Sequence, residues 1–141
     1  MRHNCLITGP ITDKIVAEIS CNLGKDTSAG GHSIFLGRVR ADQVNGKTVK
    51  AIEYTAYEGM VDIETRKIAA EILSSFDDVK SIEILHSLGT VNAGEISLLV
   101  GVAAGHRKQA TEACSKSVEL IKERLPVWKK EIFGDDSHEW K

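Results

Sequence analysis

Two lysines near the end of the chain have a spacing that could serve anion binding or catalysis. Lys122 falls in the last turn of an expected helix, at the edge of its apolar stripe, and Lys129 follows the break at Pro126. Because the chain is extended after this proline, Lys129 can turn back toward Lys122. A lysine whose stem lies on apolar surface can act as an acid, a base or a nucleophile. The pattern alone favours the alternative, in which Lys122 is simply solvated.

His106 and Arg107 form a second basic pair, directly after Gly105 and at the start of another expected helix. Backbone N–H groups at a helix N-terminus are unpaired and attract anions. An arginine adds a forked donor, and a histidine adds a donor that can carry charge near neutral pH. The pair therefore predicts a phosphate or carboxylate site, or else an ordinary helix start with two exposed polar residues.

Arg38 and Arg40 form a third basic cluster, at the end of an apolar segment that includes Phe35 and Gly37. Arginines at a strand end can point into a cleft, but residues i and i+2 project to the same side without any ligand. Together, the three clusters predict an anion-binding cleft. The residue types alone do not identify a reaction.

The elements that position these clusters are expected to alternate between strands and helices. Apolar periodicity predicts strands over residues 3–8, 32–39, 49–57, 79–86 and 96–103, and helices from Thr12 to Gly24, over residues 59–76 and over 108–125. An extended piece at 127–133 precedes an acidic tail. Asn45-Gly46 predicts a hairpin turn, and residues 87–95 resemble a turn-rich connection. The order predicts an α+β fold with antiparallel pairing rather than a doubly wound parallel sheet.

Length and composition predict one continuous domain over residues 1–141, because 42% of the residues are hydrophobic. The formal net charge is −2, which argues against a protein that binds nucleic acid. Between Arg107 and Lys130, however, seven basic residues oppose three acidic ones, a local charge of +4. This asymmetry suits a small anionic ligand or an acidic partner.

Cysteine and histidine positions give no metal-binding pattern. Cys5, Cys21 and Cys114 are far apart and contain no C-x-x-C pair, so we interpret them as free structural thiols. His3 and Cys5 alternate on one expected strand but lack a second ligand pair, and we expect no metal. The N-terminus is too short and polar for a signal peptide, and no long apolar run predicts a membrane span. The expected location is the cytoplasm.

Five segments in this order resemble one known family: FLGRVR, EYTAYEGM, HSLGTVNAGE, GHRKQATEAC and IKERLPVWKKEIF with a later tryptophan. They resemble the large, catalytic subunit of molybdopterin synthase, the MoaE family, over residues 32–140. The resemblance implies an α/β-hammerhead fold with three main helices, and a homodimer. Each protomer would bind one small ubiquitin-like sulfur-carrier subunit, giving a heterotetramer.

The resemblance also implies a reaction. The partner's C-terminal thiocarboxylate would supply sulfur to cyclic pyranopterin monophosphate, forming the dithiolene of molybdopterin without a cofactor or metal in this chain. It assigns seven residues to the site: catalytic Lys122 and Lys129, and substrate-binding Phe35, Arg40, His106, Arg107 and Val118. The family's His-Arg pair reaches into the neighbouring protomer's site. Ser87 departs from the family, which often has arginine there, and whether Lys141 replaces a basic residue of longer relatives stays open.

Two other functions compete with a sulfur-transferring enzyme. A non-catalytic adaptor could dock a ubiquitin-like protein without chemistry, although docking alone would not require both Lys122 and Lys129. A nucleotide- or RNA-binding module is opposed by the acidic net charge, the three phenylalanines and the lack of an aromatic, basic surface strand.

Overall fold

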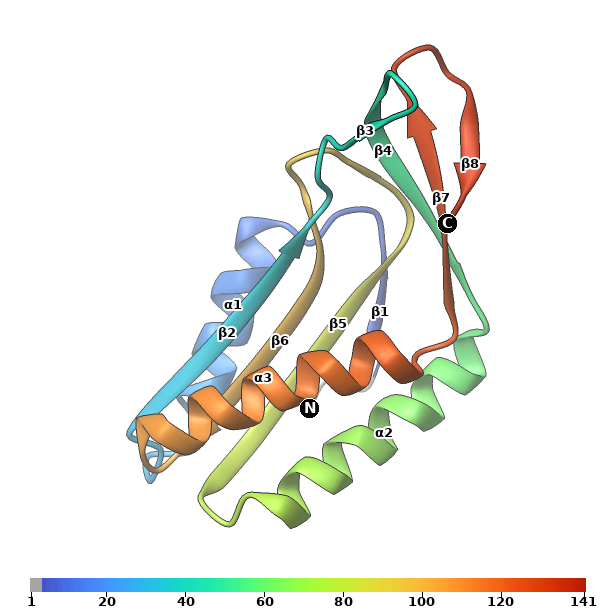
Figure 1. The fold of residues 1–141 in the computed structure, drawn as a ribbon. Helices are drawn as coiled ribbons and strands as arrows, with labels where there is room; N and C mark the ends of the chain where they lie inside the picture. Colours follow the sequence, from blue (N-terminus) through green and yellow to red (C-terminus); the bar gives the residue numbers. More distant parts are fainter. Residues whose placement is uncertain (1–3) are drawn as a thin grey trace.

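The computed structural model describes residues 4–141, so the histidine at position 3, expected in the first strand, lies outside the described residues. Over this range the chain forms three helices and eight strands (Figure 1). The helices are α1 (Asp13–Leu23), α2 (Glu58–Ser75) and α3 (Arg107–Arg124). The strands are β1 (Leu6–Thr8), β2 (Gly31–Arg38), β3 (Gln43–Val44), β4 (Lys47–Ala56), β5 (Val79–Asn92), β6 (Ile96–Ala104), β7 (Val127–Phe133) and β8 (His138–Trp140).

The strands form one sheet in the order β2-β6-β5-β4-β7-β8, with β1 added to β5 and β3 to β4. Neighbours are antiparallel except β1 and β5, which are parallel. The long β5 connects two parts of this sheet, because its first half pairs with β6 and its last residues pair with β4. In Figure 1, β4, β7 and β8 rise above the larger part of the sheet. The predicted α+β class is confirmed.

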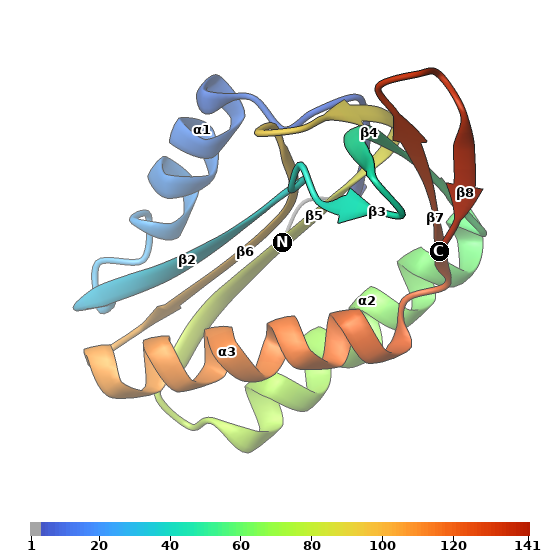
Figure 2. The same cartoon turned by 45° about the horizontal axis from the view of Figure 1, so that its top comes forward.

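Helices cover both faces of the larger part of the sheet. Helices α2 and α3 lie side by side on one face, and α1 lies on the other (Figures 1 and 2). Helix α1 begins where predicted, because the Thr12 hydroxyl accepts a hydrogen bond from the Ile15 N–H at 3.3 Å. Its buried Ile19 and Leu23 pack with Leu99 of β6.

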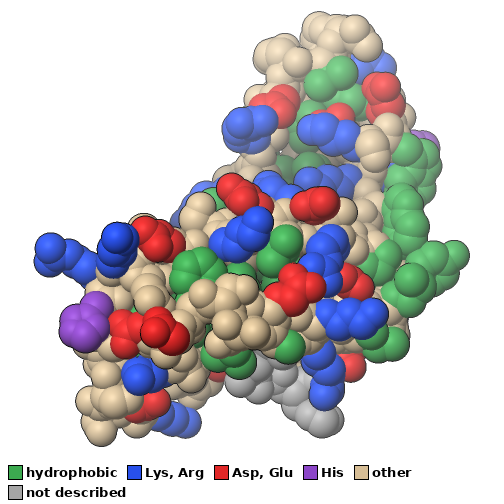
Figure 3. All heavy atoms as spheres, turned by 60° about the horizontal axis from the view of Figure 1, so that its bottom comes forward, with side chains coloured by type: hydrophobic (Ala, Val, Ile, Leu, Met, Phe, Trp, Pro, Cys, Tyr) green, Lys and Arg blue, Asp and Glu red, His purple; other side chains and the backbone are tan. Residues whose placement is uncertain are grey.

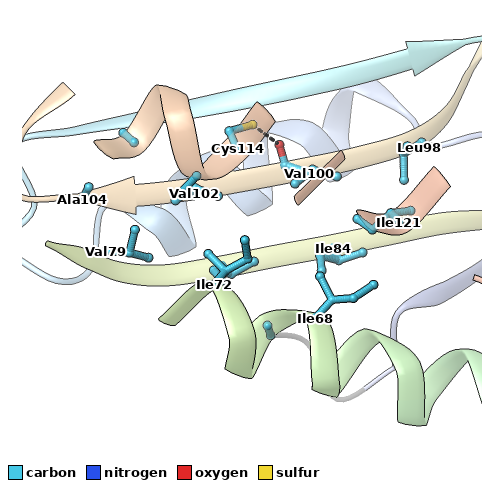
Figure 4. Close-up of a cluster of buried hydrophobic side chains, with 14 residues drawn as sticks. Ile68, Ile72, Val79, Ile84, Leu98, Val100, Val102, Ala104, Cys114 and Ile121 are labelled. Carbon is cyan, nitrogen blue, oxygen red and sulfur yellow. Dashed lines mark hydrogen bonds between the residues drawn. The ribbon is translucent and has the colours of Figure 1, made fainter. Parts of the chain in front are cut away.

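A core between α2, α3 and the sheet fixes the helix that carries Lys122. Figure 4 shows Ile72 of α2 and Ile121 of α3 directed toward β5 and β6. Cys114 is buried, as expected, and its thiol lies 3.5 Å from the Val100 carbonyl oxygen. Because Ile121 is 2% exposed, the last turn of α3 is held against the sheet at the position next to Lys122.

Two predicted connections were wrong. Residues 87–95 are not a long turn, because β5 continues to Asn92 and only residues 93–95 turn. Gly89 adopts a φ of +77° where the strand passes from its β6 pairing to its β4 pairing, a conformation that glycine takes without strain. The acidic tail contains a strand that the sequence did not predict, β8, which pairs with β7.

The predicted hairpin between residues 32–39 and 49–57 does not form either. Asn45 and Gly46 do make a tight turn, with φ values of 51° and 78°, but it joins the two-residue β3 to β4. Strand β2 pairs instead with β6, which is far along the chain. Local turn residues set the turn, whereas the partner of β2, which lies at the edge of the sheet, is a strand distant in the sequence.

Candidate anion-binding site

A cavity of about 430 Å³ lies where β2 ends, α3 ends, and β4, β5 and β7 pass. Four residues predicted from the sequence line it: Phe35, Arg40, Lys122 and Lys129. They come from segments almost 90 residues apart, since 122 − 35 = 87. The sheet therefore brings together two of the three basic clusters that the sequence shows.

Strand β7 aims Lys129 into the cavity through its register with β4. Lys129 lies opposite Tyr54, and Glu131 lies opposite Ile52. Residues i and i+2 of a strand share a face, so all four side chains line the same wall, as the cavity residues confirm. Trp128 projects to the other side of β7 and is 44% exposed. Because the chain turns at Pro126, Lys122 of α3 and Lys129 of β7 line the same cavity.

Lys129 has an altered acidity in this setting. Partial burial lowers its pKa, and the ammonium groups of Lys122 and Lys141 lower it further, while the Glu131 carboxylate opposes them. Glu131 is 5% exposed, and one of its carboxylate oxygens lies 3.5 Å from the Lys141 amine. Lys141 lines the cavity because its backbone N–H donates to the Lys129 carbonyl oxygen at 2.9 Å. Three lysines and one buried carboxylate therefore share the cavity.

Phe35 and the two arginines form the opposite wall. Gly37 makes room for the Phe35 ring, because a Cβ atom at Gly37 would lie 3.2 Å from the ring carbon Cε1. The Arg40 guanidinium is exposed and forms two hydrogen bonds with the Asp42 carboxylate, at 3.0 and 3.4 Å. Arg38 donates to the Gly94 carbonyl oxygen at 2.7 Å. An anion that enters the cavity would therefore compete with Asp42 for Arg40.

His106 and Arg107 lie at the far end of α3, away from this cavity. Fifteen residues of helix separate Arg107 from Lys122, a rise of roughly 22 Å. The Asp78 carboxylate already occupies the helix start: it accepts the His106 backbone N–H at 2.7 Å and lies 3.1 Å from Nδ1. Gly105 allows this approach, since a Cβ there would lie 2.3 Å from an Asp78 oxygen. Within one chain, this pair does not join the lysines.

Val118 is also absent from the cavity wall. Its partly buried side chain packs against the core cluster between α2, α3 and the sheet. The structure thus places four of the seven predicted residues together, two others elsewhere on α3, and His106 at the N-cap of that helix. The sequence reasoning missed Tyr54, His86 and Glu131, which line the cavity. The i, i+2 spacing of Lys129 and Glu131 was the one signal that could have indicated the carboxylate.

The described part of the chain shows neither a metal-binding cluster nor a membrane-spanning helix. No three His, Cys, Asp or Glu residues there are grouped so that they could hold a metal ion. No helix in residues 4–141 has the length and apolar character needed to span a membrane.

The chain matches known proteins in sequence and in structure. The profile of the family described as MoaE protein matches residues 11–124. The molybdopterin synthase catalytic subunit of Dictyostelium discoideum is 42% identical over 118 residues, which cover 82% of this chain and 74% of that protein. The protein of the same name from Drosophila willistoni is 39% identical over all of this chain, but the chain spans only 37% of its length.

Solved structures give the same result for the fold. The molybdopterin synthase structure from Staphylococcus aureus has a TM-score of 0.86 and 29% identity, and the match covers all of this chain and 98% of that one. A chain from a complex of subunits 1 and 2 of molybdopterin-converting factor from Helicobacter pylori shares the fold, with a TM-score of 0.80 and 21% identity. The fold and the site together define this protein as an α+β protein with a lysine-lined cavity. The chain belongs to the MoaE protein family.

Proposed function

We propose that this chain is the catalytic subunit of a molybdopterin synthase. It would transfer sulfur from the C-terminal thiocarboxylate of a small ubiquitin-like subunit to cyclic pyranopterin monophosphate. The convergence of Lys122 and Lys129 in one cavity carries the proposal. Both reactants are anionic, and fixed positive charge in a partly closed cavity stabilises such groups.

The cavity residues divide into two roles in this proposal. In net terms, each transfer exchanges one substrate oxygen for sulfur and leaves the partner's tail as a carboxylate. Lys122 would protonate or polarise the leaving oxygen, or assist release of the spent tail. Lys129, whose pKa is lowered, is suited to accept a proton. Phe35 and Arg40 would hold the substrate.

An exposed apolar surface beside the cavity supports docking of a protein partner. Tyr57 and Trp128 stack edge to face with their ring centroids 5.1 Å apart, although both are exposed. Met60 and Trp140 are 58% exposed, and both are large hydrophobic side chains. Figure 3 shows hydrophobic side chains gathered along the edge of the molecule where α2 begins and β7 and β8 lie. Trp128 precedes Lys129 in β7 but projects from the opposite face, so a partner bound here would pass an extended tail around the edge of the sheet to reach the cavity.

The proposal includes a homodimer with shared sites. His106 and Arg107 are too far along α3 to meet the lysines of their own chain. In a two-fold dimer they would instead complete the cavity of the neighbouring copy. We further propose that residues 1–141 act as a single catalytic domain, and that the protein works in the cytoplasm.

The decisive experiment combines the purified protein with thiocarboxylated small subunit and cyclic pyranopterin monophosphate, and measures molybdopterin. The variant Lys122→Ala is compared with Lys116→Ala, a matched change at an exposed lysine of the same helix. We expect wild type and Lys116→Ala to form product, and Lys122→Ala to be slower by about 100-fold, the lower range for lost acid–base catalysis. A wild type that binds the small subunit yet forms no product would make the chain an adaptor.

A further inference from the structure

His86 is a buried histidine in the cavity wall to which the proposed chemistry gives no role. It lies on β5 and is 8% exposed. Its ring packs edge to face on Tyr54, with centroids 5.1 Å apart and an interplanar angle of 80°. Its backbone N–H donates to the Cys5 carbonyl oxygen at 2.8 Å. Both the ring and the backbone are therefore held in place, unlike those of an exposed histidine.

One ring nitrogen of His86 forms a hydrogen bond within the chain and the other does not. Nδ1 lies 2.8 Å from the Ser87 carbonyl oxygen, which can only accept, so Nδ1 carries the proton. Nε2 has no hydrogen-bond partner within residues 4–141. In that range the wholly buried side-chain nitrogen and oxygen atoms without a partner are Ser81 Oγ and Ser87 Oγ. Nε2 is therefore not sealed in the interior and keeps contact with the cavity.

The surroundings of His86 disfavour the charged form of its ring. Burial lowers its pKa, the hydrogen bond to Ser87 raises it, and the ammonium groups of Lys129 and Lys122 lower it, with a net decrease. A neutral ring protonated on Nδ1 has a lone pair on Nε2. The titratable and charged groups that line the cavity with it are Arg38, Arg40, Asp42, Tyr54, Lys122, Lys129, Glu131 and Lys141.

The other side-chain acceptors of this cavity each have a partner within the chain. Asp42 binds Arg40, and Glu131 lies against the Lys141 amine. Ser97 Oγ accepts the hydroxyl proton of Tyr54 at 3.0 Å. The lysines and arginines only donate. A ligand with both a phosphate and N–H or O–H groups would find many donors for the phosphate, while Nε2 of His86 would offer the ligand's own donors a neutral acceptor that has no partner within residues 4–141.

We propose that His86 positions the substrate by accepting a hydrogen bond through Nε2 from an N–H or O–H group of the bound pterin. This inference rests on the proposed function, because the pterin is the ligand that brings such donors. The cationic side chains would hold the phosphate, and His86 would set the orientation of the ring system. Its role is recognition of the uncharged part of the substrate.

Three substitutions separate this role from a structural one. His86→Phe keeps a ring against Tyr54, His86→Asn keeps a donor near the Ser87 carbonyl, and both remove Nε2. His86→Gln loses the ring but places an amide oxygen near the position of Nε2. The control is His32→Gln, at an exposed histidine of β2. Affinity for cyclic pyranopterin monophosphate is measured by calorimetry, and the nitrogen resonances of ¹⁵N-labelled imidazoles are followed by NMR with and without this ligand.

We expect roughly tenfold weaker binding for His86→Phe and His86→Asn, the loss of about one hydrogen bond, with much of the affinity kept in His86→Gln and all of it in His32→Gln. The His86 Nε2 resonance should be that of an unprotonated nitrogen, and it should shift when the ligand is added. Unchanged affinity in the first two variants, or an Nε2 resonance that ignores the ligand, would overturn the role of His86. Wild type that neither binds the pterin nor forms product would instead overturn the proposed function.

Discussion

Mixing two inactive variants tests whether the active site is shared between copies of the chain. Lys122→Ala removes the lysine at the end of α3, and Arg107→Ala removes the arginine at its beginning. The helix separates the two Cα atoms by roughly 22 Å. Even with both side chains extended by about 6 Å toward each other, a gap of roughly 10 Å remains. One small anion therefore cannot contact both residues of the same chain.

The expected recovery follows from counting sites. In a two-fold dimer, random pairing of the two variants gives mixed dimers in half of the assemblies. Each mixed dimer holds one site with both substitutions and one site with neither. The mixture should therefore recover about a quarter of the wild-type molybdopterin-forming activity, whereas each variant alone has no intact site.

The assay co-expresses the two variants with different affinity tags and measures the unseparated mixture with thiocarboxylated small subunit. Mixed dimers isolated through both tags should reach about half of the wild-type activity, because one of their two sites is intact. The matched control mixes Lys122→Ala with Lys129→Ala, which line the same cavity of one chain. This control should recover nothing, because every site still lacks one lysine. No recovery in the Lys122 and Arg107 mixture, despite dimers of the correct mass, would refute the shared site.

Three further predictions concern packing, charge and thiol access. Ile121→Ala should lower the free energy of unfolding by about 2–5 kcal/mol in urea titration, because Ile121 is 2% exposed. Lys129→Met should raise it at pH 7 by about 0.5 kcal/mol, since the pKa of Lys129 is lowered by partial burial. Cys21 alone should react with a thiol reagent in the native protein, as judged by mass, because Cys5 and Cys114 are buried and burial raises the pKa of both thiols.

Because the pKa of Lys129 is lowered, its effect on the free energy of unfolding depends on pH. The folded state disfavours the charged amine, so at neutral pH the lysine costs stability. This cost disappears as the pH rises through the lowered folded pKa toward the ordinary value of 10.5, where the variant should lose its advantage. A gain that persists above pH 11 would contradict the reasoning.

For the thiols, unfolding in urea should expose all three to the reagent, and native labelling of Cys114 would contradict its burial. A loss below 1 kcal/mol for Ile121→Ala would show that the core relaxes around it.

The sequence predicted those features that depend on neighbours along the chain. Thr12 predicted the start of α1, because a threonine hydroxyl can satisfy an N–H group of the first turn. Asn45-Gly46 predicted a tight turn, because both residues tolerate positive φ. Pro126 predicted the end of α3, which stops at Arg124. The family resemblance named Lys122 and Lys129 on motif grounds.

Pairing across the sheet was decided by tertiary structure. Nothing local to β2 indicates that it pairs with β6 rather than with the strand after the Asn45-Gly46 turn. The same holds for β5, whose last residues were expected to turn but find hydrogen-bond partners on β4. Strand partners depend on which faces are buried, and burial is a property of the whole assembly of elements.

The site shows the same division between local pattern and assembly. The chain determined by itself that Lys122 lies on a helix and Lys129 on the extended segment that follows. Only the register of β7 with β4 made Lys129 face Tyr54, and only the long β5 brought His86 into the same wall. The charge and chemistry of each side chain follow from the identity of the residue. The distances between side chains, their burial and the lowered pKa of Lys129 arise only when segments distant in sequence pack together and exclude water.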